Sequence, residues 1–231
     1  MTDRIDELKK QAAEKAVAQV RSGMVLGLGT GSTAVHATRA IGRLWQSGGL
    51  TDIVAIPTSE VTAQEARKFD IPLVTLEQAP AVDITIDGAD EITPALDLIK
   101  GFGGALLREK IVAASSKRLI IVADDSKLVR RIATKFPVPV EVIPFAKQPV
   151  SQALESLGAK VSLRFKEENT PFITDEQNLI FDCTFENGIE DAVSISQQML
   201  NIPGVVEHGL FLSMAQEAIV ASESGLSVLS L

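Results

Sequence analysis

MVLGLGTGST, residues 24–33, joins an apolar run to a glycine-rich turn. The apolar run is typical of a buried strand, and residues 34–45 after the turn place apolar side chains at helical spacing. A turn between a strand and the start of a helix presents free backbone N–H groups and the positive end of the helix dipole, which together favour an anion. The segment therefore predicts a strand, a phosphate-binding turn and a helix, in that order.

Two common nucleotide-binding motifs do not match this turn. The dinucleotide motif requires glycine at its sixth position, where this chain has Ser32, and no acidic residue ends the next predicted strand, residues 52–57. The nucleotide P-loop requires a lysine before its Ser or Thr, and the turn contains none. The hydroxyl groups of Thr30, Ser32 and Thr33 suit a monophosphate ester, while the alternative is that Ser32 or Thr33 only caps the helix. No cofactor is expected.

Strand-like and helical patterns alternate over the first half of the chain. Residues 5–20 place apolar side chains at helical spacing and predict a first helix. Further strands are predicted at residues 52–57, 72–76, 82–86 and 118–124, and further helices at residues 59–69 and 105–115. This alternation predicts an α/β fold in which helices cover both faces of a parallel sheet.

The pattern changes near residue 136. Residues 136–149, FPVPVEVIPFAKQP, contain four prolines in fourteen residues, which interrupts helices and indicates a crossing into a separate unit. The strands predicted there are residues 140–143, 160–165, 172–174 and 178–185, and the helices are residues 150–157 and 191–200. We expect one domain of residues 1–136 and 206–231 and a small α+β domain of residues 137–205. The last segment is expected to return to the first sheet through an alanine-rich helix, with residues 222–231 as a loosely held tail.

The composition limits the classes of partner. The chain has 231 residues, of which 45% are hydrophobic, so it can bury a full core. Its net charge of -8 leaves no basic surface for nucleic acid or anionic membranes, and no apolar run approaches the roughly 20 residues that span a bilayer. Neither nucleic acid nor a membrane is an expected partner.

Cysteine and histidine are scarce. Cys183 is the only cysteine, which excludes an internal disulfide, favours a reducing compartment and is best interpreted as a packed, inert thiol. With its charged start, the chain is expected to be cytoplasmic, or soluble within an organelle whose targeting segment is missing. His36 and His208 are the only histidines and have no zinc-site spacing, so no metal is expected.

A second group of polar residues follows a later strand. The apolar part of VDITIDGADE, residues 82–91, ends at Ile86, so Asp87 is expected at the carboxyl end of a parallel strand, where ligands bind in open α/β sheets. In KGFGGALLREK, residues 100–110, three glycines within four residues let backbone approach a ligand closely, with Lys100 before them and Glu109 after them. For these residues alone, a substrate site, a metal site and a solvated acidic turn with a surface Lys100–Glu109 pair all remain open.

The order of the motifs narrows these alternatives. Along the chain come GLGTGSTA (27–34), DGADE (87–91), KGFGGALLREK (100–110), ADDSK (123–127) and FPVPVEVIP (136–144). Together they resemble the type A ribose-5-phosphate isomerases, over nearly the whole chain as far as residue 211. The resemblance implies a Rossmann-like domain with an inserted α+β domain, a homodimer or homotetramer, and metal-free interconversion of ribose 5-phosphate and ribulose 5-phosphate. The pentose 5-phosphate is then the expected small-molecule partner.

The resemblance also implies a role for each matching residue. Glu109 matches the base that moves a proton between carbons 1 and 2, and Lys100 matches the cation that faces the reacting oxygens. Asp87 and Asp90 match acids that contact the sugar hydroxyls and help to open the ring, whereas Glu91 has no implied substrate role. The implied substrate-binding residues are Thr30, Gly31, Ser32, Thr33, Gly88, Ala89, Gly101, Phe102, Gly103, Lys127 and Lys9.

Phe102 departs from the family pattern, because many members have glycine at this position. A positive φ would strain phenylalanine, so we expect an ordinary φ, a side chain that points away from the substrate, and an effect on loop mobility rather than on chemistry.

Two other functions remain to be weighed. An amino-sugar-phosphate deaminase would usually need a histidine near the sugar ring, and a non-catalytic sugar-phosphate sensor would normally adjoin a DNA-binding motif. Neither histidine lies in the motifs, and the sequence begins directly with the first predicted helix.

Overall fold

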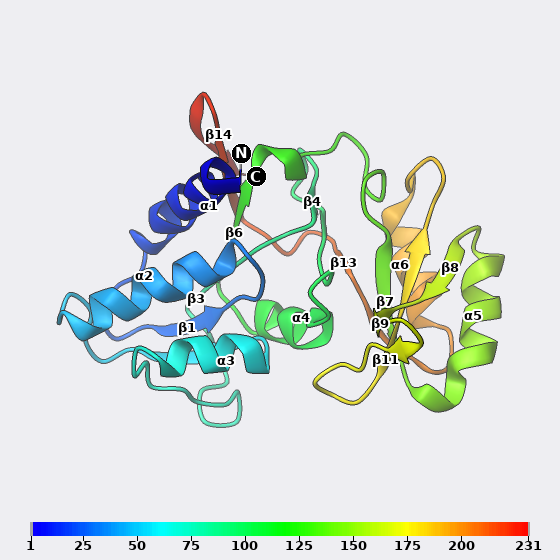
Figure 1. Ribbon diagram of the computed structural model, residues 1–231, viewed down its shortest axis with the longest axis horizontal. Coiled ribbons are helices and arrows are strands. Elements are labelled where there is room, and N and C mark those ends of the chain that lie inside the picture. The colour runs from blue at the N-terminus through cyan, green and yellow to red at the C-terminus, as the bar shows by residue number, and fades with distance from the viewer. Residues whose placement is uncertain (1, 231) are drawn as a thin grey trace. The chain divides into compact units, whose positions relative to one another are not determined.

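The computed structural model describes residues 2–230 and separates them into two units (Figure 1). The first unit runs through Ala89 and also contains Arg108–Lys127 and the chain from Ser213 onward. The second unit contains Asp90–Leu107 and Leu128–Leu212. The first unit has one sheet and the second unit has three among the described residues, and each unit has its own apolar core.

The first unit alternates strands and helices. Its helices are α1 (Thr2–Val17), α2 (Ala34–Gln46), α3 (Glu60–Arg67), α4 (Leu106–Ala114, of which the first two residues belong to the second unit) and the short 3-10 helix η1 (Asp125–Lys127). Its strands are β1 (Val25–Leu28), β2 (Val54–Pro57), β3 (Ile84–Asp87), β6 (Leu119–Asp124), β14 (Glu217–Ser222) and β15 (Gly225–Ser230). Among the described residues, these strands form a sheet in the order β15-β14-β6-β3-β1-β2. Each neighbouring pair is parallel except β14–β15, which is antiparallel.

Helices cover both faces of this sheet. Small side chains of α1 and α2 pack with Leu26 and Leu28 of β1 in one large core, because alanines let the helices approach the sheet closely. Gly27 faces the other side, where an added Cβ would lie 1.8 Å from Thr85 Oγ1 and 2.9 Å from Val112 Cγ1 of α4. Glycine is therefore required where β1 passes β3 and α4. The predicted α/β fold is confirmed.

The prediction for the end of the chain was wrong. The alanine-rich segment forms strand β14 rather than a helix, and it pairs with β6 on one side and β15 on the other. Ala218–Ala221 are all buried, so packing on both sides of the strand outweighs the helical preference of alanine. Residues 225–230 form β15 and are not a loose tail, whereas Leu231 lies outside the described residues.

Two shorter predicted strands were also wrong. In the segment 72–76, Leu73 makes a single bridge with Ala55, and the chain then turns where the Gln78 N–H donates to the Thr75 carbonyl. Residues 172–174 lead into a second turn, in which the Gln177 N–H donates to the Thr174 carbonyl. In both places the tight turn ends the strand pairing.

The second unit is an α+β structure. Its helices are α5 (Lys147–Ser156), α6 (Ala192–Leu200) and the 3-10 helix η2 (Pro144–Ala146). Its strands are β4 (Glu91–Ile92), β5 (Leu98–Ile99), β7 (Val138–Val142), β8 (Lys160–Leu163), β9 (Phe165–Glu167), β10 (Thr170–Pro171), β11 (Leu179–Thr184), β12 (Val205–His208) and β13 (Leu210–Phe211). The described strands form sheets in the orders β12-β7-β11-β8, β13-β5-β4 and β10-β9. Val150 of α5 and Met199 of α6 belong to the core that includes Val140 and Phe181 of the largest of these sheets.

The division between the units differs from the predicted domain boundaries. The prediction grouped residues 90–107, 128–136 and 206–212 with the first domain, whereas in the structure they belong to the second unit. The reason is the sheet β13-β5-β4, in which Ile99 pairs with both Glu91 and Leu210. These pairs join segments that are distant in the sequence, so no local pattern indicates them.

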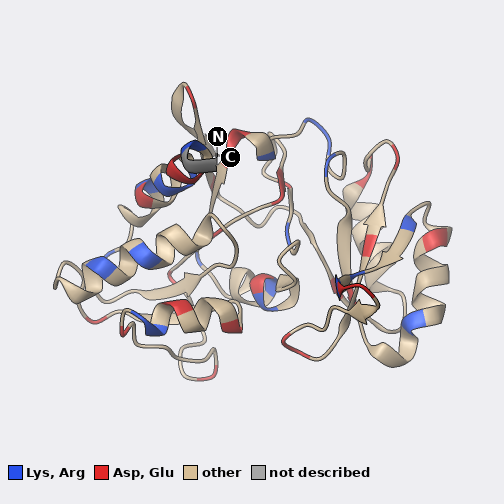
Figure 2. Ribbon diagram, in the orientation of Figure 1, with Lys and Arg blue, Asp and Glu red and all other residues tan. Residues whose placement is uncertain are grey.

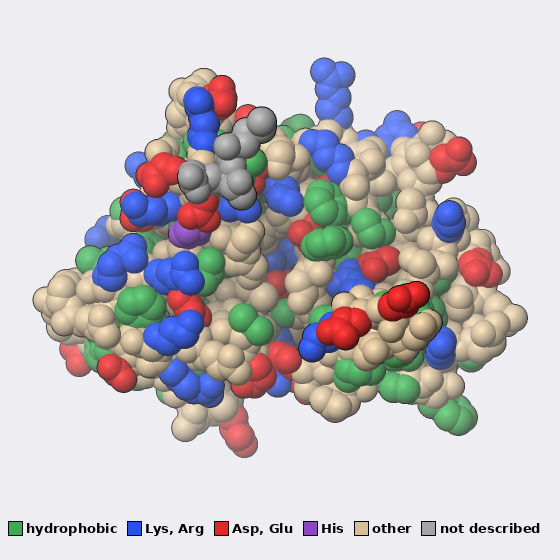
Figure 3. All heavy atoms as spheres, viewed as in Figure 1, with side chains coloured by type: hydrophobic (Ala, Val, Ile, Leu, Met, Phe, Trp, Pro, Cys, Tyr) green, Lys and Arg blue, Asp and Glu red, His purple; other side chains and the backbone are tan. Residues whose placement is uncertain are grey.

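Charge is mixed along the helices. Figure 2 shows basic and acidic residues interspersed on α1, and the face drawn in Figure 3 carries both kinds of side chain.

Cys183 is fully buried, and burial raises the pKa of its thiol to about 12, which confirms the interpretation of a packed, inert thiol. Within residues 2–230, every helix is too short or too polar to cross a bilayer.

Candidate active site

The glycine-rich turn lies between β1 and α2, as predicted. Gly31 has φ +114°, a conformation that favours glycine, and the Val35 N–H donates to its carbonyl at the start of α2. Thr33 precedes the helix and makes no side-chain capping hydrogen bond, so the alternative of a simple cap is wrong for this residue. Lys9 Nζ donates to Ser32 Oγ at 2.9 Å, which brings this predicted phosphate-contacting lysine to the turn.

A cluster of hydroxyl groups holds Thr30. Its Oγ1 lies 2.7 Å from Thr58 Oγ1, 2.8 Å from Ser59 Oγ and 3.1 Å from Thr62 Oγ1. The Thr62 hydroxyl also donates to the Gly29 carbonyl at 3.0 Å. The side chain of Thr30 therefore anchors the turn to the segment between β2 and α3. This role of residues 58–62, TSEVT, was not predicted, because these residues lie about 30 positions from Thr30 in the sequence.

Asp87 ends β3 and is 1% exposed. Its Oδ1 accepts hydrogen bonds from the Thr30 N–H at 3.0 Å and from the Gly88 N–H at 2.7 Å. An added Cβ on Gly29 would lie 2.2 Å from the same oxygen, so glycine at this position makes room for the carboxylate. As predicted, Asp87 lies at the carboxyl end of a parallel strand, directly beside the glycine-rich turn.

Glu109 lies in the first turn of α4 and is 3% exposed. The neighbouring Arg108 forms an ion pair with Glu60 of α3, with 2.9 Å between Nη1 and Oε1. Consecutive helical residues project about 100° apart, so Arg108 and Glu109 leave the helix in different directions. The first turn also exposes Glu109 to the positive end of the helix dipole, which stabilises negative charge.

Lys127 lies in η1, directly after β6. The preceding Asp124 is 5% exposed, and its Oδ1 accepts hydrogen bonds from both the N–H and the hydroxyl of Ser126. This pair of bonds shapes the turn that carries Lys127. The glycine-rich turn, Asp87 and Lys127 thus follow the carboxyl ends of three adjacent parallel strands, β1, β3 and β6.

The second unit carries the remaining predicted groups. Asp90 Oδ2 accepts a hydrogen bond from the Phe102 N–H at 3.0 Å, which closes the segment between them. Lys100 is 2% exposed, and its ammonium group lies 5.4 Å from the ring centroid of Phe211. Since Lys100 and Glu109 are both buried, the alternative of a surface pair is wrong.

Phe102 has an ordinary φ, as expected. The positive φ values of this loop fall on Gly101 (+99°) and Gly104 (+84°). The Phe102 ring is 61% exposed but packs edge to face against Phe136, with 5.6 Å between ring centroids. The ring is therefore held within the second unit, not left without support.

Arg164 holds the same loop from a distant strand segment. Its Nη1 donates to the Gly101 carbonyl at 2.8 Å and to the Phe102 carbonyl at 3.0 Å, and its guanidinium carbon lies 5.7 Å from the Phe102 ring centroid. Nε and Nη2 of the same side chain donate to the carboxylate of Asp182, giving a two-point ion pair. No pattern in the sequence connects Arg164 with a loop some 60 residues earlier.

Glu91 has a structural role. It is fully buried, and its carboxylate accepts hydrogen bonds from the N–H groups of Ala133, Lys135 and Phe136 at 2.5–2.7 Å. These bonds tie the segment before β7 to β4. Among residues 2–230, no group of three or more His, Cys, Asp and Glu side chains is arranged to hold a metal ion.

Comparison with known proteins gives close matches. The family model of ribose 5-phosphate isomerase A (phosphoriboisomerase A) matches residues 54–225. Ribose-5-phosphate isomerase A from Synechococcus sp. (strain JA-3-3Ab) is 51% identical over 225 residues, covering 97% of both chains. The structure of ribose 5-phosphate isomerase A from Methanocaldococcus jannaschii has a TM-score of 0.92 and 40% identity, covering 97% of this chain and 99% of that chain. A D-ribose-5-phosphate isomerase in complex with phospho-erythronic acid has a TM-score of 0.94 and 38% identity, covering 98% and 99%. The names of these relatives do not favour the two alternatives, an amino-sugar-phosphate deaminase and a non-catalytic sugar-phosphate sensor.

Proposed function

Because the chain belongs to the ribose-5-phosphate isomerase A family, we propose that Glu109 is the base of its reaction. The chain is an isomerase of the pentose phosphate pathway. The observation that carries the assignment of the base is that Glu109 is only 3% exposed and lies in the first turn of α4. A carboxylate that is fixed on a helix keeps its position beside the substrate, so it can take up a proton from one carbon and deliver a proton to the next.

The proposed reaction moves one proton between neighbouring carbons of the open-chain sugar. Glu109 takes the proton from carbon 2 of ribose 5-phosphate, and the electron pair of that C–H bond forms the carbon–carbon double bond of an enediolate. The aldehyde electrons move to oxygen 1 at the same time. The carboxyl group then returns the proton to carbon 1, the proton of the carbon 2 hydroxyl passes to oxygen 1, and oxygen 2 becomes the ketone. No electrons enter or leave the substrate.

Lys100 is proposed to stabilise the enediolate. General base catalysis contributes about 10²- to 10⁴-fold, which leaves the negative charge on oxygen to be stabilised by another group. A buried ammonium group does this strongly, because the effective dielectric constant around it is low. Lys100 is 2% exposed and is the cation that the family motif provides.

Asp87 and Asp90 are proposed to open the sugar ring and to bind its hydroxyls. Ring opening removes a proton from the hydroxyl on carbon 1 and places a proton on the ring oxygen. A carboxyl group can accept the first proton and donate the second. The Thr30 and Gly88 N–H groups orient Asp87, and the Phe102 N–H orients Asp90. The backbone of Gly88, Ala89, Gly101 and Gly103 is proposed to approach the same sugar.

The glycine-rich turn is proposed to bind the phosphate. Backbone N–H groups of the turn, the start of α2 and the Lys9 ammonium group beside Ser32 all favour a dianion. Lys127 is proposed as a further substrate-contacting cation. The relative that was solved with phospho-erythronic acid supports a site for a phosphorylated ligand in this family. Binding the phosphate orients carbons 1 and 2, where small displacements are costly.

Glu109→Gln tests the assignment of the base. We expect turnover to fall by about 10²-fold or more with little change in KM, because the amide cannot accept the proton. Glu141→Gln is the matched control, since Glu141 is also a buried carboxyl group (1% exposed) but lies on β7. Steady-state kinetics with ribose 5-phosphate distinguish the two variants. Turnover at the wild-type rate in Glu109→Gln would contradict the assignment.

We also propose that the protein is a cytoplasmic homodimer or homotetramer that needs no metal or cofactor. The family resemblance supports the oligomer, and the single buried thiol suits a reducing compartment. Light scattering of the purified protein measures the subunit number directly, and a monomer at micromolar concentration would contradict the proposal.

A further inference from the structure

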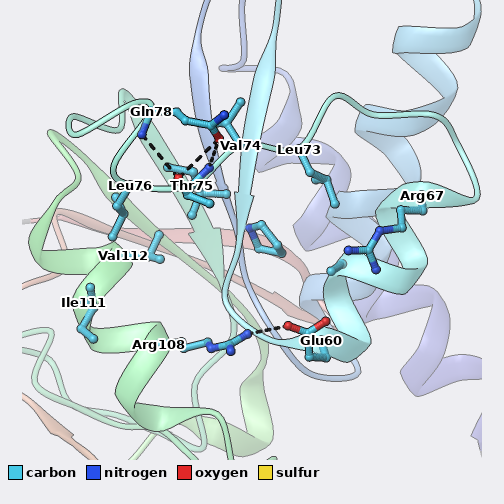
Figure 4. Close-up of a pocket in the computed structure, with 13 residues that line it drawn as sticks. Glu60, Arg67, Leu73, Val74, Thr75, Leu76, Gln78, Arg108, Ile111 and Val112 are labelled. Atoms are coloured by element: carbon cyan, nitrogen blue, oxygen red, sulfur yellow. Dashed lines mark hydrogen bonds and ion pairs between the residues drawn. The ribbon is translucent and has the colours of Figure 1, made fainter. Parts of the chain in front are cut away.

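A pocket of about 480 Å³ opens in the first unit between α3, α4 and the loop of residues 73–78 (Figure 4). One part of its lining is apolar and includes Ile56, Leu76, Ile111 and Val112. The volume lies within the roughly 300–1,000 Å³ that is usual for small-molecule sites. None of the residues to which the family motifs assign a role lines it.

Two arginines add positive charge to this pocket. Figure 4 shows the side chains of Arg67, from α3, and Arg108, from α4, pointing toward the same space. Arg108 pairs with Glu60, and this ion pair holds the pKa of Glu60 below its ordinary value, so Glu60 stays charged at neutral pH. The Arg67 side chain makes no hydrogen bond or ion pair with any other described residue, although its charge also lowers the pKa of Glu60. The charged residues that line the pocket, Glu60, Arg67 and Arg108, therefore carry a net charge of +1.

From this combination we propose that the pocket binds a small organic anion with an apolar body. The anionic group would accept hydrogen bonds from Arg67 and Arg108, and the apolar body would cover Ile56, Leu76 and Val112. A sugar phosphate suits this lining less well, because hydroxyl groups that face Ile56, Leu76 and Val112 would have no hydrogen-bond partners. An uncharged apolar molecule would bury the Arg67 guanidinium without a partner.

The pocket is distinct from the proposed phosphate site, although one segment contributes to both. Between β2 and α3, Thr58 and Ser59 hydrogen-bond to Thr30 of the glycine-rich turn, while Pro57 and Glu60 line the pocket. The two ligands would therefore contact different residues of this segment. Saturating ribose 5-phosphate should leave binding in the pocket in place.

Naphthalene-2-sulfonate is a suitable probe, because it joins one sulfonate to a flat apolar body. Isothermal titration calorimetry on the full chain should give one saturable site per chain. Arg67→Ala should weaken binding by about tenfold or more, since a hydrogen bond to a charged group is lost. Arg67 is exposed, so its replacement does not disturb the core. Arg21→Ala is the matched control, because Arg21 is also an exposed arginine of the first unit but does not line the pocket.

Two further arms locate the probe. Methanesulfonate, which has only the anion, and 2-naphthol, which has only the apolar body, should each bind at least about tenfold more weakly than the probe. Two results would overturn the proposal: equal affinity of the probe for Arg67→Ala and the wild type, or displacement of the probe by ribose 5-phosphate.

Discussion

Three acids that lie within five residues of one another have different surroundings. Asp87 accepts hydrogen bonds from two backbone N–H groups at the end of β3, and Asp90 accepts one from the Phe102 N–H. Glu91 is fully buried and accepts hydrogen bonds from three backbone N–H groups. The sequence places Asp87 at a strand end, because the apolar run before it is a local signal. The surroundings of Glu91 could not be predicted, because its partners are residues 133–136.

Arg164 provides a prediction at the scale of a single residue. The double variant Arg164→Met/Asp182→Asn removes both charges, so no unpaired carboxylate stays buried. We expect kcat/KM to fall by about tenfold or more, with the larger change in kcat, because the carbonyls of Gly101 and Phe102 lose the donor that orients the loop after Lys100.

Arg131→Met is the matched control for this double variant. Arg131 also joins a carbonyl and a carboxylate, Asn187 and Glu190, but on the surface of the same unit. We expect its kcat and KM to stay close to those of the wild type. A double variant with wild-type kcat/KM would show that Arg164 has only a structural role.

At the scale of elements, the sequence predicted well wherever burial and local pattern agree. The strands β1, β3 and β6 and the helices α2 and α4 lie within a few residues of the predicted ranges. β14 was missed because alanine-rich sequence favours a helix locally, and only pairing with β6 and β15 selects the strand.

Strand β7 gives a prediction for pH. Glu141 Oε1 accepts hydrogen bonds from Thr174 at 2.8 Å and Asn178 at 2.9 Å, so it holds the turn before β11, and burial raises the pKa of Glu141. A carboxyl group whose pKa is raised by folding stabilises the fold while protonated, and this contribution is lost as pH rises through the folded-state pKa. We therefore expect Glu141→Gln to gain free energy of unfolding, relative to the wild type, as pH rises.

Urea unfolding at pH 4 and at pH 8 measures this difference. The glutamine amide keeps an acceptor oxygen for Thr174 and Asn178 but does not ionise, so the wild type should lose more stability than the variant between the two pH values. Equal changes in the two proteins would mean that Glu141 titrates alike in the folded and unfolded chains.

At the scale of the whole molecule, the predicted site residues belong to both units. Asp87, Glu109 and Lys127 lie in the first unit, and Asp90 and Lys100 lie in the second. The chain passes from one unit to the other after Ala89, Leu107 and Lys127, within or beside the motifs that carry these residues. The motifs could be found from the sequence, but this division could not, because it depends on the distant pairing of β5 with β13.

Proton exchange with solvent tests the central claim most directly. Ribose 5-phosphate is incubated in deuterated water with the wild type, Glu109→Gln or Glu141→Gln, and deuterium at carbon 2 of ribose and carbon 1 of ribulose is followed by NMR. Proton transfer through an enediolate predicts label at both carbons for the wild type and for Glu141→Gln, and a rate at least about 10²-fold lower for Glu109→Gln. Label appearing in Glu109→Gln at the wild-type rate would contradict Glu109 as the base.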